Sequence, residues 1–398
     1  MRYYSHLQSA RQIIEGYNGK EPFHRYIRTF FAQHKKFGSR DRKQISGLCY
    51  AYWRLGDSLN TLSIDDRILA GHFLCVNPSS ENASDPVLEQ LKPEWNTALN
   101  LSIAEKFTLI TGDTDAWDKA GTAIFPWLDQ LSEPIDPKQF TASFFIQPDL
   151  FLRARPGKEK QVADKLTKAA ISFQHIPPTA FAMPNSSKID EVIKLNTEAV
   201  VQDLSSQQVQ ELMQLVPSTP AGIRLWDCCA GSGGKTILAF DTFKKLTITV
   251  SDKREPILVN LAKRFNEAGI GQYQSLLADM AIGSGRNPSK YNYDLIIADV
   301  PCSGSGTWGR TPEWLHFFDP AAIDTYSALQ KKIVINAAPH VADNGYFLYI
   351  TCSVFRKENE EVVEHIQANT GLELVKMEVL KGYHRKADTM FAALFKRP

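Results

Sequence analysis

The sequence predicts an α/β protein whose carboxyl-terminal half is a doubly wound domain. From residue 222 onward, apolar strand-like runs alternate regularly with helix-like stretches, a pattern typical of a parallel sheet covered on both faces. Residues 1 to about 130 show helical spacing and few β-branched runs, which indicates an all-α region. Residues 141–215 mix short strand-like runs with one amphipathic helix pattern. A chain of 398 residues is long enough for two or three such domains.

We therefore expect a helical domain over 1–135, a small α+β subdomain over 141–215 and the doubly wound domain over 216–398. The Pro- and Asp-containing run EPIDPKQF, 133–140, is predicted to be the linker. Within the α+β segment, SFFI and TAFAM have the character of strands, and KEKQVADKLTKAAI has that of an amphipathic helix.

The start of the helical region is basic. Residues 1–54 contain eleven Lys and Arg against three Asp and Glu, with a cluster in HKKFGSRDRK at 34–43. Such a cluster can neutralise nucleic-acid phosphates and release their counterions, but an ordinary solvated helix face explains it equally well. The whole chain has a net charge of only +1, so any basic surface must be local.

Composition excludes several classes of protein. No apolar run approaches the roughly 20 residues of a membrane helix, and MRYYSHLQSARQIIEGY lacks the apolar core of a secretory signal, so we expect a cytoplasmic protein. The six cysteines show no CxxC spacing, which argues against a zinc site or a disulfide framework. Cys49 and Cys75 lie in apolar surroundings and are expected to pack in the core.

The first strand-like run of the doubly wound region, IRLWDC, leads into the glycine-rich segment DCCAGSGGKT at 227–236. Glycines allow a tight turn close to a ligand, and the helix that follows directs its N–H groups towards that ligand. Only two residues separate Gly231 from the Gly234-Lys235-Thr236 triplet, so this is not a P-loop. The segment favours a nucleotide-type cofactor, with a purely structural turn as the alternative.

Two acidic residues follow the next candidate strands. Asp252 ends the run LTITVSD, 25 residues after Asp227, where a carboxylate can bind both hydroxyls of a ribose. Asp279 ends QSLLAD and can accept from an adenine amine, or it can serve as an ordinary cap or turn residue.

Two cysteines fall just past neighbouring candidate strands. Cys302 follows YDLIIADV, and Cys352 lies at the end of GYFLYITCS, fifty residues later. Core cysteines should lie inside the apolar runs, whereas these lie where a strand passes into a loop, on the same edge as the glycine-rich segment. Their placement predicts catalytic roles.

A thiolate is the nucleophile needed to add to C6 of a pyrimidine ring, which makes C5 able to attack an electrophilic methyl group. An acid must then protonate or hydrogen-bond N3 and N4, and Asp299, three residues before Cys302, is the candidate. A second thiol, or a water that it holds, can assist release of the product.

The blocks DCCAGSGGKT, ADVPCSGSGTWGRTPEW and YITCSVFRKENEEVVEHI resemble, in order and spacing, the signatures of Sun/NOP-type RNA cytosine-5 methyltransferases. VVQDLSSQQV, at 200–209, and the terminal ADTMFAALFKR extend the resemblance. FFAQHKKFGSRDRKQI resembles the helical, NusB-like RNA-binding domain of the bacterial small-subunit rRNA members. The fold that this implies is a Rossmann-like methyltransferase sheet with an antiparallel last strand, preceded by a small α+β subdomain and the helical domain.

The resemblance implies a role for each site residue. Cys352 would bond to C6 of the cytosine, Cys302 would promote breakdown of the adduct, Asp299 would contact the flipped base and Lys235 would lie beside it. S-adenosylmethionine would be the cofactor. Its expected contacts are Cys228, Cys229, Ala230, Gly231, Ser232, Gly233, Gly234, Asp252, Asp279 and Asp299.

The sequence departs from the family pattern in two places. Gly231 and Ser232 replace the usual Ala-Pro of the cofactor loop, which frees the turn. Gly309 and Arg310 stand where Arg-Arg is common, so one substrate-contacting arginine is missing.

The expected substrate is small-subunit (16S) rRNA, and the expected protein is a monomer without a metal ion. A tRNA methyltransferase and a non-catalytic ribosome-assembly factor are alternatives. A DNA cytosine-5 methyltransferase is disfavoured, because there the Pro-Cys cysteine is the nucleophile and is usually followed by Gln, whereas Ser303 follows here and Cys352 is present.

Overall fold

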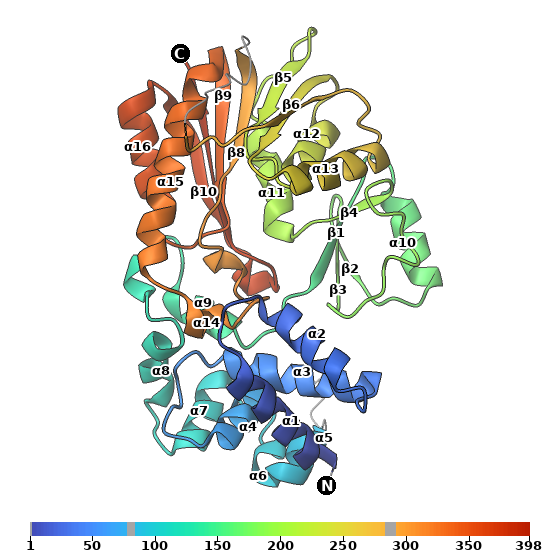
Figure 1. Cartoon of the computed structure of the whole chain (residues 1–398), viewed down its shortest axis with the longest axis vertical. Helices are drawn as coiled ribbons and strands as arrows, with labels where there is room; N and C mark the ends of the chain where they lie inside the picture. Colours follow the sequence, from blue (N-terminus) through green and yellow to red (C-terminus); the bar gives the residue numbers. More distant parts are fainter. Residues whose placement is uncertain (1, 78–83, 283–291) are drawn as a thin grey trace. The chain divides into compact units, whose positions relative to one another are not determined.

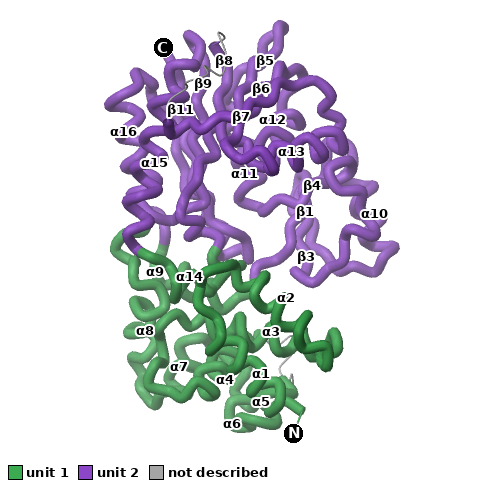
Figure 2. The backbone as a smooth tube through the Cα atoms, in the orientation of Figure 1, with its two compact units in different colours: residues 1–131, 136–147, 308–319 green, residues 132–135, 148–307, 320–398 purple. Residues whose placement is uncertain are grey.

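The computed structural model describes residues 2–77, 84–282 and 292–398, which form two compact units (Figures 1 and 2). The first unit consists of residues 1–131, 136–147 and 308–319. The second consists of residues 132–135, 148–307 and 320–398. Both sheets belong to the second unit, so residues 148–215 of the expected α+β segment form one compact body with most of the doubly wound region.

The first unit is helical. Some of its helices begin at capping residues such as Ser102, whose hydroxyl and the Glu105 carboxylate form a reciprocal capping box. Apolar side chains from the first helices, including the buried Cys49, form its core. Cys75 is only half-buried. The helices are α1 (Arg2–Gly16), α2 (Phe23–Gln33), α3 (Ser39–Trp53), α4 (Ile64–Cys75), α5 (Pro86–Leu91), α6 (Pro93–Asn96), α7 (Ile103–Thr111), α8 (Ala116–Ile124), η1 (Leu128–Gln130), α9 (Pro137–Ser143) and α14 (Trp314–Phe317).

Helix α9 corrects two expectations from the sequence. The predicted linker at 133–140 contains the start of this helix, because Asp136 caps it through the Gln139 N–H and Pro137 occupies its first position. The predicted strand SFFI instead lies at the end of α9 and in the turn after it. Phe140 and Phe144 are one helical turn apart and both buried, so the helix places both rings on one buried face.

Residues 308–319 belong to the helical unit, although their sequence lies within the expected domain 216–398. Trp308 is buried beside Phe125 and Trp127. The backbone N–H of Phe23 donates to the Glu313 carboxylate. Burial of a tryptophan among aromatic rings accounts for this placement, since such side chains dominate core energetics.

The smaller sheet of the second unit is antiparallel, in the order β2-β3-β1-β4. The predicted run TAFAM contains one of its strands, and the predicted amphipathic helix is α10. Its elements are β1 (Leu150–Ala154), α10 (Glu159–Lys168), β2 (Gln174–Ile176), β3 (Ala180–Met183) and β4 (Ala199–Val201).

Among the described residues, the larger sheet has seven strands in the order β10-β11-β9-β8-β5-β6-β7. Five neighbouring strands, β9 to β7 in that order, are parallel, and β11 runs antiparallel to both of its neighbours. The strands are β5 (Ile223–Asp227), β6 (Leu246–Asp252), β7 (Gln274–Leu277), β8 (Tyr293–Asp299), β9 (Val341–Thr351), β10 (Glu373–Leu380) and β11 (Met390–Lys396). The predicted α/β class and its antiparallel last strand are therefore confirmed.

Helices cover both faces of this sheet. Figure 1 shows α11, α12 and α13 on one side and α15 and α16 on the other. The apolar faces of α11, α12 and α13 share a core with the inner residues of the strands. The connecting helical elements are α11 (Leu204–Met213), α12 (Gly234–Thr242), α13 (Glu255–Glu267), η2 (Ser305–Thr307), α15 (Ala321–Ala337), η3 (Ala338–His340), α16 (Glu360–Thr370) and η4 (Tyr383–Arg385).

The sequence patterns did not predict β10. This strand lies at the edge of the sheet, and most of its residues are exposed or half-exposed, so it lacks the apolar run that marks a buried strand. Within the described ranges, no helix combines the length and apolar character needed to cross a membrane.

Candidate active site

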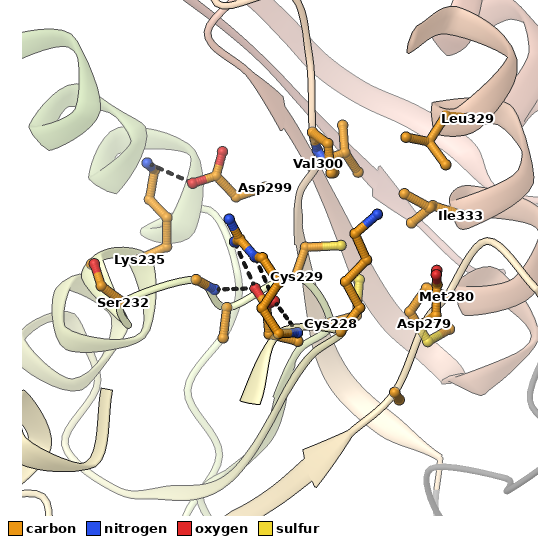
Figure 3. Close-up of a pocket in the computed structure, with 18 of the residues that line it drawn as sticks. Cys228, Cys229, Ser232, Lys235, Asp279, Met280, Asp299, Val300, Leu329 and Ile333 are labelled. Atoms are coloured by element: carbon orange, nitrogen blue, oxygen red, sulfur yellow. Dashed lines mark hydrogen bonds and ion pairs between the residues drawn. The ribbon is translucent and has the colours of Figure 1, made fainter. Parts of the chain in front are cut away.

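A cavity of about 500 Å³ lies at the carboxyl ends of the parallel strands (Figure 3). This is the edge where doubly wound sheets bind ligands, and the volume lies within the usual range of ligand pockets. Four loops and helix α15 form its wall. The lining residues are Cys228, Cys229, Ala230, Gly231, Ser232, Gly234, Lys235, Asp252, Lys253, Arg254, Ala278, Asp279, Met280, Asp299, Val300, Pro301, Tyr326, Leu329 and Ile333.

The glycine-rich loop after β5 turns sharply before α12. Gly231 and Gly233 have positive φ angles of 52° and 84°. A Cβ on Gly233 would lie 2.5 Å from the Phe265 ring, so this residue serves close packing. Of the ten predicted cofactor contacts, all in the described part of the chain, Gly233 alone is not among the residues that line the cavity.

Ser232, one of the two departures from the family loop, has its own partner. The Arg264 guanidinium on α13 donates to the Ser232 hydroxyl at 2.7 Å and to its carbonyl at 2.9 Å. These two hydrogen bonds restrain the turn that the missing proline would otherwise stiffen.

Asp252 at the end of β6 is buried and carries several hydrogen bonds. Oδ2 accepts from the Gly231 N–H at 3.0 Å, and Oδ1 accepts from the Arg254 N–H at 2.9 Å. The Arg254 guanidinium also donates to both oxygens, at 3.0 and 3.1 Å. Burial opposes ionisation of this carboxyl, but the hydrogen bonds from Arg254 outweigh it and lower the pKa of Asp252.

Asp279 takes one of the two roles that the sequence left open, that of a turn residue. It lines the cavity, and its Oδ1 accepts from the Ala281 N–H at 2.9 Å, as a turn residue does. Its contact with an adenine amine stays a prediction.

Lys235, on the first turn of α12, forms an ion pair with Asp299 at the end of β8. Its Nζ lies 3.1 Å from Asp299 Oδ2 and 2.9 Å from the hydroxyl of Ser206 on α11. Figure 3 marks the ion pair with a dashed line. Lys235 is buried, with 7% of its surface exposed, whereas the Asp299 side chain is 33% exposed. The carboxylate is therefore the member of the pair that a substrate reaches more easily.

Cys302 and Cys352 form a thiol pair. Their Sγ atoms are 3.1 Å apart, and the Cys352 N–H lies 3.3 Å from Cys302 Sγ. Both are half-buried, and Pro301, which precedes Cys302, lines the cavity. The hydrogen bond with Cys352, together with burial, raises the pKa of the Cys302 thiol well above its ordinary value.

Glu358 was not predicted from the sequence, yet it joins the two cysteine loops. Its fully buried carboxylate accepts from the Ser303 N–H at 2.9 Å and the Ser353 hydroxyl at 2.6 Å. The Gln330 side chain donates a third hydrogen bond at 2.9 Å. The acidic run KENEE has the pattern of a solvated helix start, which conceals a carboxylate that faces the core.

Ser206 was also missed as a site residue. The only signal for it was the resemblance of VVQDLSSQQV to the segment that precedes the catalytic domain in Sun/NOP-type enzymes. Tyr326, Leu329 and Ile333 of α15, which line the cavity, were missed because helical apolar spacing is usually a sign of core packing.

Together the sheet and its cavity define the class of protein. A doubly wound sheet with one antiparallel strand, a glycine-rich turn before a helix, and an acidic residue at the end of the next strand form a Rossmann-like methyltransferase domain. The cofactor of this class is S-adenosylmethionine, and the residues present fit it. The buried carboxylate of Asp252 suits a ribose, and the start of α12 suits a polar group beside the loop.

Residues 212–394 match the family described as 16S rRNA methyltransferase RsmB/F. The resemblance to Sun/NOP-type rRNA methyltransferases, predicted from the signature blocks, is confirmed for this region, and S-adenosylmethionine is confirmed as its cofactor.

Curated relatives carry matching names. Ribosomal RNA small subunit methyltransferase B of Cronobacter sakazakii is 29% identical over 174 residues, which are 43% of this chain and 38% of that protein. The probable ribosomal RNA small subunit methyltransferase B of Synechocystis sp. is 29% identical over 252 residues, or 60% and 55% of the two chains. The chain thus spans about half or less of the length of these relatives.

Solved structures share the fold. The crystal structure of PH0851 matches with a TM-score of 0.69 and 19% identity, covering 95% of each chain. The crystal structure of NSun6 from Pyrococcus horikoshii with SFG matches with a TM-score of 0.58 and 14% identity, covering 68% of this chain and 97% of that one. Identities this low establish likeness of fold.

Proposed function

We propose that this protein transfers a methyl group from S-adenosylmethionine to C5 of a cytosine in RNA, through a covalent bond between Cys352 and C6. The observation that carries the proposal is the pair of thiols, 3.1 Å apart, beside the cofactor cavity. The names of the curated relatives support small-subunit rRNA as the substrate. Action as a monomer, in the cytoplasm and without a metal ion, belongs to the same proposal.

The cofactor supplies an electrophilic methyl group when it is bound. The loop of residues 228–234 would hold it, with Asp252 on the ribose and Asp279 on the adenine amine. Asp299 also borders the cavity and lies three residues before Cys302, which supports a contact with both the cofactor and the base.

The two cysteines act in different steps: Cys352 attacks the base, and Cys302 assists release of the product. The Cys352 thiolate adds to C6, the electrons of the C5–C6 double bond move to C5, and the Asp299 carboxylate accepts a hydrogen bond from the N4 amino group. C5 then takes up the methyl group. Removal of the C5 proton by a base restores the double bond as the C6–S bond breaks.

Cys302 acts in the release step. Because its pKa is raised, it retains a proton that it can offer to the departing sulfur of Cys352 at 3.1 Å. The attack on C6 is assigned to Cys352 because of the resemblance of YITCSVFRKENEEVVEHI to the signature block of the family. A base must leave its stack to reach these groups, so the target cytosine is expected to be unpaired or flipped out.

The direct test is methyl transfer from labelled S-adenosylmethionine to 16S rRNA, tRNA and DNA, followed by nucleoside analysis. Formation of 5-methylcytosine in 16S rRNA is the expected result. If 5-methylcytosine formed in tRNA alone, tRNA and not 16S rRNA would be the substrate. Methylation at another atom would refute the proposed chemistry. No transfer to any RNA would leave the chain as an RNA-binding assembly factor.

A further inference from the structure

The ammonium group of Lys235 is held from two sides. An ammonium has three N–H donors. Two of those of Lys235 are used, one by Asp299 Oδ2 at 3.1 Å and one by Ser206 Oγ at 2.9 Å. Because only 7% of Lys235 is exposed, these partners, and not bulk water, determine where the charge lies.

Ser206 is itself oriented by a second donor. Its Oγ accepts from Gln202 Nε2 at 3.1 Å, and its carbonyl accepts from the same nitrogen at 3.3 Å. A hydroxyl oxygen has two acceptor positions, so Lys235 and Gln202 together occupy both. The rotation of the Ser206 hydroxyl is thereby restricted to one arrangement.

The orientation of the Gln202 amide is determined in turn. Its Oε1 accepts from Arg153 Nε at 2.7 Å, and an arginine nitrogen can only donate. A flipped amide would present its NH₂ group to that donor, so Nε2 must face Ser206. Arg153 is ion-paired with Asp241, and both side chains are almost completely buried. The position of the Arg153 guanidinium is therefore fixed.

We propose that Ser206 is a positioning residue for Lys235. Its hydroxyl is oriented by a buried series of hydrogen bonds through Asp241, Arg153 and Gln202. This series of hydrogen bonds begins on α12 and the small antiparallel sheet and ends at the Lys235–Asp299 pair. Its function is to keep the ammonium beside the carboxylate that contacts the base. The inference rests on the proposed function for its catalytic consequence, but not for its geometry.

The test uses the full chain with four variants. Ser206→Ala removes the acceptor, Ser206→Thr retains a hydroxyl, Lys235→Gln removes the ammonium, and Ser206→Ala/Lys235→Gln combines the two changes. Glu211→Gln, on an exposed position of the same helix, is the matched control. Methyl-transfer rates, cofactor affinity and melting temperature are measured for each.

Ser206→Ala should lower kcat about 10-fold, the size of one lost hydrogen bond to a charged group, while cofactor affinity stays within about 2-fold. Ser206→Thr should recover most of the rate. The double variant should be no slower than Lys235→Gln, because Ser206 acts only through the lysine. Independent, multiplying losses in the double variant would overturn the inference, since they would show a structural role separate from Lys235.

A second readout does not depend on activity. Acylation of lysines by an N-hydroxysuccinimide ester, mapped by mass spectrometry, should modify Lys235 several-fold faster in Ser206→Ala than in the parent or in Ser206→Thr, with Lys253 as the internal reference. If Lys235 is released in this way but the parent transfers no methyl group, the proposed function fails and the positioning role stands. If the parent is active and Ser206→Ala changes neither rate nor acylation, the positioning role fails alone.

Discussion

The Sγ atoms of Cys302 and Cys352 lie 3.1 Å apart although fifty residues separate them in the chain. They meet because β8 and β9 are adjacent parallel strands, and each cysteine follows the end of one of them. Two thiols in contact can share one reaction, with one sulfur bonded to the substrate and the other assisting its release.

The cysteine variants should therefore behave differently. Cys302→Ala is expected to accumulate a covalent protein–RNA adduct, because addition to C6 remains possible and release is slowed. Cys352→Ala should form none. Denaturing gels of each variant after incubation with RNA and S-adenosylmethionine provide the measurement, with Cys75→Ala as the control cysteine. Adduct formation by Cys352→Ala instead would reverse the assignment.

Arg254 should compete with the cofactor for Asp252. The guanidinium and backbone of Arg254, with the Gly231 N–H, supply four hydrogen bonds to the two carboxylate oxygens, so ribose hydroxyls must displace some of them. Since the Arg254 side chain is 58% exposed, its ion pair is weak, and Arg254→Gln should tighten cofactor binding by up to about 5-fold. Lys253→Gln, which removes a neighbouring charge, should not. Isothermal titration calorimetry decides between tighter and unchanged binding.

Asp252 itself should be essential for binding. Asp252→Asn replaces an acceptor by a donor at a buried position and should weaken S-adenosylmethionine binding at least about 10-fold. The same calorimetric titration measures this loss. Unchanged affinity would remove Asp252 from the cofactor site.

Glu358 should hold the cysteine loops together. In Glu358→Gln the amide NH₂ would face a donor from Ser303, Gln330 or Ser353, and one unmade hydrogen bond of this kind costs about 1–3 kcal/mol. We expect lower stability in urea and a loss of methyl transfer of at least about 10-fold. Glu364→Gln, exposed on α16, is the matched control. A fully active Glu358→Gln enzyme would contradict this role.

Stability should depend on pH through Asp227. This carboxyl is fully buried, and burial raises the pKa of Asp227 to about 7, although Thr236 donates a hydrogen bond to it. The folded state thus binds more protons than the unfolded state between about pH 4 and pH 7, so the free energy of unfolding should fall as the pH rises through that window, by at most about 4 kcal/mol from this group.

Asp227→Asn isolates that contribution because the amide does not titrate. Urea unfolding of both proteins from pH 4.5 to pH 8 should show a shallower fall in stability for the variant. Parallel curves would mean that Asp227 ionises normally in the folded protein.

Much of the site could be predicted from the sequence because parallel strands place their carboxyl ends at one edge. The ends of IRLWDC, LTITVSD, QSLLAD and YDLIIADV locate the glycine-rich loop, Asp252, Asp279 and Asp299, and all of these line one cavity. Cys302 and Cys352 follow by the same rule. Local apolar runs are sufficient for this inference, because strand direction and connection type follow from the alternation of strands and helices.

Tertiary packing alone decided the rest. The sequence pattern around Glu358 is that of a solvated acid, and the pattern around Ser206 is that of an ordinary helix residue. Neither pattern indicates the role that the structure shows, because hydrogen bonds to distant residues leave no local pattern. The same holds for residues 308–319, which Trp308 anchors in the helical unit. The sequence by itself determined which strand ends carry the chemistry. The structure determined which side chains orient those groups, since such contacts form only between segments that folding brings together.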